Sequence, residues 1–106
     1  MNDTNPRVRM TAREIAVIRT SVNRLIGDRA SIRIFGSRAR KDEKGGDIDI
    51  LIETERQLPS RLASAYRLTS ELQMQLGDQK IDVIIIEPGM REQPIHQIAR
   101  QTGVIL

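Results

Sequence analysis

The chain has 106 residues and a mass of 12.0 kDa, which suits one small domain and excludes a multi-domain enzyme. Hydrophobic residues make up 39% and charged residues 29%, the proportions of a folded globular protein rather than a disordered or fibrous one. The chain has no cysteine, which excludes disulfides, zinc knuckles, iron–sulfur clusters and thiol catalysis, so any metal must be held by oxygen ligands. No apolar run approaches the roughly 20 residues of a membrane span and no secretory signal is present, so we expect a cytoplasmic protein.

The charge balance is mildly basic and the aromatic content is very low. Lys and Arg number 17 against 14 Asp and Glu, which gives a net charge of +3 and suits an anionic ligand or an acidic partner surface. Phe35 and Tyr66 are the only aromatic residues, whereas proteins that stack single-stranded nucleic acid need several exposed rings. We therefore expect no direct binding to nucleic acid.

The first part of the chain predicts a loose lead-in followed by a helix. Residues 1–10 show no periodicity and are expected to precede the ordered part of a single domain that covers the whole chain. Thr11 and Glu14 have the spacing of a capping box, and apolar residues then recur at helical intervals until Gly27. An amphipathic helix is expected here.

Two short strands are predicted next, separated by a polar segment. Residues 31–35, SIRIF, alternate polar and apolar side chains and end at Gly36. Residues 47–53, DIDILIE, alternate again, with the isoleucines on one face and both Asp47 and Asp49 on the other. Nothing in the intervening SRARKDEKGG can build a core.

A second helix and a third strand follow. The helical pattern opens at Pro59 and ends at Gly77, and its apolar stripe includes Tyr66, which we expect to lie in the core. Residues 80–86, KIDVIII, are apolar on both faces except for Asp82, as expected for an interior strand buried between two layers.

The end of the chain predicts one more helix. Residues 94–102 carry apolar side chains at helical spacing, and the single histidine, His96, is expected to be a surface or packing residue rather than a general base. The order helix, strand, strand, helix, strand, helix predicts an α/β (α+β) fold, a small mixed sheet of three or more strands covered by helices.

The aspartates are the strongest sign of chemistry. Asp47 and Asp49 lie two positions apart on a strand, so their side chains project from one face with Cα atoms about 7 Å apart. Asp82 on a neighbouring strand would complete a cluster of three carboxylates, which is costly unless cations neutralise it. Mg²⁺ is the natural counter-ion, and a pair of such ions serves in-line phosphoryl or nucleotidyl displacement. A lone pair of aspartates is usually a solvated edge; the third acid in an apolar strand favours a function.

The turn after the first strand supplies possible phosphate contacts. Gly36 lets the backbone N–H groups and the Ser37 hydroxyl approach a phosphate closely, as the tail of a nucleoside triphosphate requires. Arg38 and Arg40 could pair with phosphate oxygens or with an acidic partner, although such a charged loop is as often a solvated surface.

Taken together, IFGSRARKDEKGGDIDILIE and KIDVIII resemble the glycine-serine, DxD and third-acid motifs of the minimal nucleotidyltransferases of the DNA polymerase β superfamily. The resemblance extends over almost the whole chain. It implies that Gly36 and Ser37 hold the triphosphate and that Asp47 and Asp49 bind Mg²⁺. It also implies that Asp82 binds metal and helps to deprotonate the acceptor. Arginines such as Arg38 and Arg40 are usual in small prokaryotic members; we assign Arg40 to nucleotide binding.

The same resemblance implies a protein partner. Minimal members of this size resemble the antitoxin of a toxin–antitoxin pair, in which AMP is transferred from ATP to a tyrosine of a helical HEPN ribonuclease toxin. A non-catalytic subunit that neutralises a helical partner by occlusion is the alternative, and an enzyme that modifies small molecules such as aminoglycosides is a third reading. An exposed sheet edge leaves dimerisation or partner binding open.

Overall fold

The computed structural model describes residues 8–39, 46–77 and 79–106, and within them it contains three α-helices, a 3₁₀ helix and four strands. The Arg40 assignment lies outside the described residues. The elements follow the chain in this order: α1 (Ala12–Leu25), β1 (Ser31–Phe35), η1 (Gly36–Ala39), β2 (Ile48–Glu53), α2 (Arg61–Leu76), β3 (Ile81–Ile86), α3 (Pro94–Thr102) and β4 (Val104–Ile105).

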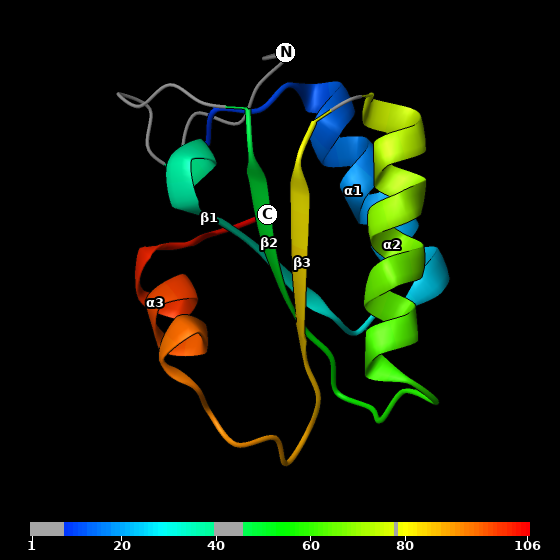
Figure 1. The fold of residues 1–106 in the computed structure, drawn as a ribbon, viewed down its shortest axis with the longest axis vertical. Coiled ribbons are helices and arrows are strands. Elements are labelled where there is room, and N and C mark those ends of the chain that lie inside the picture. The colour runs from blue at the N-terminus through cyan, green and yellow to red at the C-terminus, as the bar shows by residue number, and fades with distance from the viewer. Residues whose placement is uncertain (1–7, 40–45, 78) are drawn as a thin grey trace.

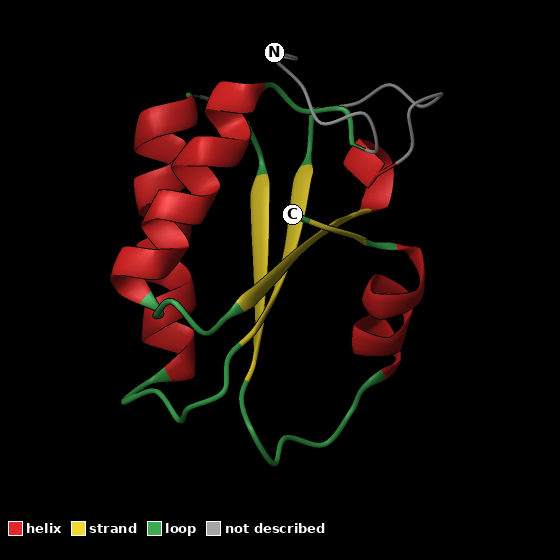
Figure 2. Cartoon of the chain, turned by 180° about the vertical axis from the view of Figure 1, so that it is seen from behind, coloured by secondary structure: helices red, strands yellow, loops and turns green. Residues whose placement is uncertain are grey.

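The sheet is mixed, with strand order β3-β2-β1-β4. β1 pairs antiparallel with both β2 and β4, whereas β2 and β3 are parallel because α2 forms the crossover between them. α1 and α2 pack together on one face of the sheet, and α3 and η1 lie on the other (Figure 1). The view from behind shows the same separation of α3 from the α1–α2 pair (Figure 2). The mixed α/β fold expected from the sequence is therefore confirmed.

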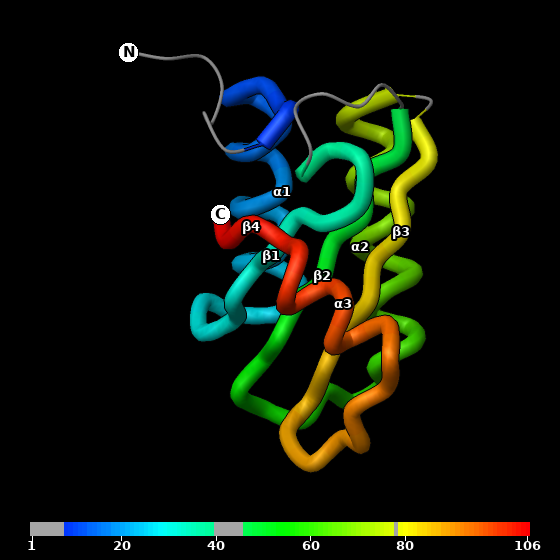
Figure 3. Tube along the Cα trace, turned by 90° about the vertical axis from the view of Figure 1, so that its left-hand side faces the viewer, coloured from blue at the N-terminus to red at the C-terminus, as the bar shows by residue number. Residues whose placement is uncertain are grey.

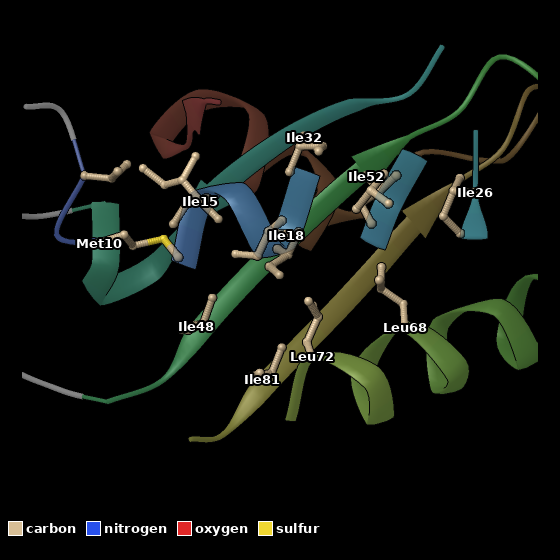
Figure 4. Close-up of a cluster of buried hydrophobic side chains, with 14 of the residues drawn as sticks. Met10, Ile15, Ile18, Ile26, Ile32, Ile48, Ile52, Leu68, Leu72 and Ile81 are labelled. Carbon is tan, nitrogen blue, oxygen red and sulfur yellow. The ribbon is translucent and has the colours of Figure 1, made fainter. Parts of the chain in front are cut away.

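The main core lies between the sheet and the α1–α2 pair. Ile18 of α1, Ile50 of β2 and Leu68 of α2 are fully buried there, and Figure 4 shows the side chains of this cluster meeting between the helices and the strands. A smaller cluster, Phe35, Leu51, Ile86 and Ala99, lies between the other face of the sheet and α3. This second cluster covers only part of its face, and the rest of the face lies at the end of β1 and the starts of β2 and β3.

Ion pairs hold α3 on this second face. Arg100 donates two hydrogen bonds to the carboxylate of Glu53, from Nη2 to Oε2 at 3.0 Å and from Nε to Oε1 at 3.1 Å. Arg33 also donates to Glu53 Oε1, at 2.7 Å. The two-point contact from Arg100 fixes the orientation of α3 on the sheet. Figure 3 shows α3 in front of the strands, with the last strand, β4, beside β1.

The capping box at the start of α1 is present. The Thr11 hydroxyl oxygen accepts a hydrogen bond from the backbone N–H of Glu14 at 3.1 Å, and Glu14 Oε1 accepts one from the N–H of Thr11 at 2.9 Å. These contacts satisfy two of the free N–H groups at the helix start, which explains why α1 begins after Thr11.

Two sequence expectations about burial are wrong. β3 is an edge strand and not an interior one, so Asp82 on it is exposed, with 54% of its side chain accessible. On α2 the buried residues are Leu68 and Leu72, whereas Tyr66 is 73% exposed. Tyr66 is exposed because α2 packs against α1 and against the edge strand β3, so only a narrow stripe of the helix is covered.

Among the described residues no helix is long and apolar enough to cross a bilayer.

Candidate active site

Strand register brings the predicted motifs to one edge of the sheet. Phe35, the last residue of β1, pairs with Asp49 near the start of β2, because these strands are antiparallel. Asp49 in turn pairs with Asp82 near the start of β3, because those strands are parallel. The glycine-serine turn, which follows Phe35, therefore lies beside the two strands that carry the acids, although 45 residues separate Ser37 from Asp82 in the sequence.

Gly36 is in direct contact with the first acidic strand. Its φ of +71° lies in the left-handed region, and a Cβ placed on it would come within 2.2 Å of Asp49 Oδ2. No other residue type fits there without moving the carboxylate. The start of η1 and the Asp49 carboxylate are thus adjacent, and Ser37 is the next residue along η1.

The acids form a cluster of negative charge. Partial burial raises the pKa of Asp49 above its ordinary value, and the neighbouring charges of Asp82 and Asp47 raise it further. A hydrogen bond between the carboxyl groups of Asp49 and Asp82 acts in the same direction. Lys80 lowers the pKa of Asp49 and forms a long ion pair with Asp82 at 3.9 Å, so it only partly offsets the repulsion.

This donor set fits a hard divalent cation. The carboxylates bear uncompensated charge, are all oxygen donors, and lie beside a backbone cradle that a Cβ would fill. Within the described residues no three acidic, histidine or cysteine side chains are gathered tightly enough to hold a metal ion by themselves. An open set of this kind is suited to Mg²⁺, which keeps several waters and is bound by one or two carboxylates together with substrate phosphates.

Arg38, next to Ser37 in η1, connects several segments of the chain that surround this site. Its Nη2 donates to Gln79 Oε1 at 2.7 Å and to the carbonyl oxygen of Gly46 at 3.4 Å, and its Nη1 lies 3.6 Å from Glu14 Oε1. The guanidinium therefore joins η1, the residue before Asp47, the start of α1 and the segment that leads into β3. Arg38 is therefore engaged by contacts within the protein.

The segment before α1 is tied to η1 by a reciprocal pair of hydrogen bonds. The N–H of Arg9 donates to the carbonyl oxygen of Arg38 at 2.8 Å, and Arg38 Nη1 donates to the carbonyl oxygen of Arg9 at 2.9 Å. Residues 8–10 are therefore part of the folded structure, with Val8 and Met10 buried, although the sequence predicted a loose lead-in over residues 1–10. The sequence did not predict this, because the apolar side chains of residues 8–10 do not recur at the spacing of a helix or a strand.

Sequence reasoning missed two contributors, Lys80 and Gln79. The spacing of Lys80 and Asp82, two apart on a strand, could have indicated that they share a face. The bond from Arg38 to Gln79 spans 41 residues and left no sequence signal. His96 is buried, and its Nδ1 accepts from the N–H of Gln93 at 3.2 Å, so it serves the start of α3 and takes no part in the site.

The structure thus combines a glycine turn packed against an acidic strand with a further acid on the neighbouring strand of a mixed sheet, an arrangement that suits the class of nucleotidyltransferases. The chain belongs to the polymerase β nucleotidyltransferase family, because the family model described as "Polymerase beta, Nucleotidyltransferase" matches residues 28–106. The matched residues include Gly36, Ser37 and the motif acids Asp47, Asp49 and Asp82. The general reaction of the family is nucleotidyl transfer. No functionally curated protein matches the chain significantly.

Proposed function

We propose that this protein is a Mg²⁺-dependent nucleotidyltransferase that transfers AMP from ATP to a tyrosine hydroxyl of a helical HEPN-type toxin and thereby acts as an antitoxin. The observation that carries the proposal is the contact of Gly36 with Asp49, beside Asp82 on the adjacent strand. It supports a site in which a triphosphate and a charged carboxylate cluster share one edge of the sheet. The adenylate, the toxin and the antitoxin role rest on the resemblance.

The position of each motif residue on the sheet indicates its role in the proposed reaction. Gly36 and Ser37, which follow β1 at the start of η1, hold the triphosphate, and Asp47 and Asp49 hold Mg²⁺. Bound Mg²⁺ would neutralise the carboxylates and stabilise the charge that develops on the transferred and leaving phosphates. Asp82 stands on the edge strand, on the opposite side of Asp49 from Gly36, where an acceptor can approach from solvent and lose its proton.

The test uses the purified protein with ATP, Mg²⁺ and the product of the adjacent gene as the candidate partner, followed by intact-mass analysis of both chains. We expect the partner to gain the mass of an AMP group, and we expect Asp82→Asn to abolish that gain. Asp28→Asn, which removes an exposed carboxylate outside the site, is the matched control and should leave the transfer intact. Transfer that persists in Asp82→Asn would contradict the proposed role of this residue.

Neutralisation by binding alone is the second candidate function, and one observation favours it. Leu62, Tyr66 and Met74 of α2 are 60%, 73% and 87% exposed, which is unusual for large apolar residues that recur along one helix. A variant with both Asp47→Asn and Asp49→Asn separates the two functions. If it still forms the complex and still neutralises the toxin, catalysis is not required.

A further inference from the structure

Lys80 places one positive charge beside the acidic residues of the candidate site. Its Nζ lies 3.9 Å from Asp82 Oδ2, and its charge lowers the pKa of Asp49. Among the described residues Lys80 forms no other ion pair and its ammonium donates no hydrogen bond, and 67% of its side chain is exposed. A long, exposed side chain with one weak contact can turn toward a ligand, because little interaction energy is lost when it moves.

The pairing of β2 with β3 places Lys80 on the same face as the acids. Asp49 pairs with Asp82 in this parallel pair of strands. The N–H of Ile48 donates to the carbonyl oxygen of Lys80 at 2.9 Å, so the alignment continues to Asp47, which comes next to Lys80. Alternate residues on paired strands project from one face of a sheet. Lys80 therefore shares the face that carries Asp47, Asp49 and Asp82.

Arg38, at the rim of the site, is a cation that is already engaged. It donates to Gln79 Oε1 at 2.7 Å and to the carbonyl oxygen of Gly46 at 3.4 Å, and it lies 3.6 Å from Glu14 Oε1. These partners set its position, so it cannot follow a ligand without breaking them. Within the described part of the chain, Lys80 is the cation at the acids that can respond to what binds there.

Free Mg²⁺ and Mg²⁺ bound to a triphosphate differ in the sign of their net charge, so Lys80 acts on them in opposite ways. Free Mg²⁺ is attracted by the carboxylates but repelled by the ammonium. A complex of Mg²⁺ with a triphosphate has a net negative charge, because the phosphate oxygens carry more charge than one Mg²⁺ neutralises. The ammonium therefore attracts the complex, while the carboxylates repel its excess charge.

We propose that Lys80 determines which form of the metal the acidic cluster accepts, disfavouring free Mg²⁺ and favouring Mg²⁺ that arrives on a nucleoside triphosphate. This inference rests on the proposed nucleotidyltransferase function and adds a specificity-determining residue to the site. While no triphosphate is present, Lys80 partly compensates the acids through its contact with Asp82. When a triphosphate is held at Gly36 and Ser37, the exposed ammonium turns toward the charge of the phosphates.

The experiment measures the binding of two probes, MgCl₂ alone and equimolar Mg·ATP, from the rise in melting temperature with ligand concentration. Lys80→Met keeps an unbranched side chain and removes only the charge from an exposed position, so it should fold normally. At low salt we expect the half-saturating concentration of Mg²⁺ alone to fall about threefold or more, and that of Mg·ATP to rise by about as much. Both shifts should shrink when KCl is added, because salt screens exposed charges.

Two further variants separate the local charge from other effects. Lys80→Arg keeps the positive charge, and both half-saturating concentrations should stay within about twofold of those of the natural chain. Arg67→Met removes one positive charge from an exposed position on α2, which packs on the face of the sheet opposite to Asp49. It changes the net charge by the same amount away from the acids, and it should leave both concentrations unchanged.

Any result in which the two affinities of Lys80→Met do not move in opposite directions would overturn the inference. Binding of both probes that weakens would show a structural defect, and binding that stays unchanged would show that the charge of Lys80 does not act on the site. A natural chain that binds Mg·ATP and transfers AMP to its partner would leave the proposed function standing in either case. If the natural chain responds to neither probe, the proposed function itself fails, and this inference fails with it.

Discussion

Replacing Gly36 by alanine tests the contact between the glycine turn and the acidic strand. The left-handed φ of +71° costs an alanine about 1 kcal/mol or slightly more in folding free energy. The new Cβ would also lie 2.2 Å from Asp49 Oδ2, so the carboxylate must move by about 1 Å to restore an ordinary van der Waals contact. A displacement of about 1 Å in a catalytic group can lower a rate about 100-fold.

Gly89→Ala is the matched control, because it places an alanine in the same left-handed backbone conformation but without a steric clash between the new Cβ and a neighbouring atom. Gly89 has a φ of +81°, and a Cβ there would meet no atom within 4 Å. Urea unfolding should show a loss of about 1 kcal/mol in both variants, while kcat/KM for nucleotidyl transfer should fall about 100-fold in Gly36→Ala alone. If Gly36→Ala retains a rate within about threefold of Gly89→Ala, the position of the Asp49 carboxylate does not limit catalysis, and the site derived above is wrong.

Three further changes are expected to have distinct effects. Asp49→Asn should raise the free energy of unfolding at pH 7 by about 0.5 kcal/mol, since it removes a partly buried charge and its screened repulsion with Asp82 and Asp47. The pKa of Asp49 is raised in the folded state, so this gain should vanish in urea titrations as the pH falls below the ordinary value of 3.8. Leu68→Ala should cost about 2–4 kcal/mol in urea unfolding because Leu68 is fully buried, whereas Leu62→Ala on the exposed side of the same helix should cost less than about 0.5 kcal/mol; equal losses would contradict the observed face of α2. Arg38→Gln should lower the free energy of unfolding by about 1–3 kcal/mol through lost hydrogen bonds in a mostly buried position, and it should weaken Mg²⁺ stabilisation in thermal melts; an unchanged response to Mg²⁺ would exclude a role in positioning the residue before Asp47.

Local patterns in the sequence predicted the elements well because their causes are local. The capping box at Thr11 and the alternation of DIDILIE depend only on neighbouring residues, and both gave the right element. The alternation also placed Asp49 on the face opposite the buried isoleucines. The catalytic and binding roles assigned to the motif residues stay predictions.

Features that depend on the order of the strands in the sheet could not be predicted from local sequence patterns. KIDVIII has the composition of an interior strand, yet it lies at the edge, because the sheet continues past β1 through a two-residue strand at the end of the chain. The exposure of Asp82 follows from that placement. The bonds from Arg38 join segments far apart along the chain, and no spacing in the sequence could have indicated them.

The reciprocal bonds between Arg9 and Arg38 make the start of the folded chain a reporter of events at the active site. The Arg9 amide proton can exchange with solvent only when its bond to the carbonyl oxygen of η1 opens. A ligand that steadies η1 should therefore slow deuterium uptake at this amide, although Arg9 lies 27 residues before Gly36 in the sequence. An affinity tag or a deletion that disturbs this segment would accordingly alter the dynamics of the glycine turn without touching a single residue of the site.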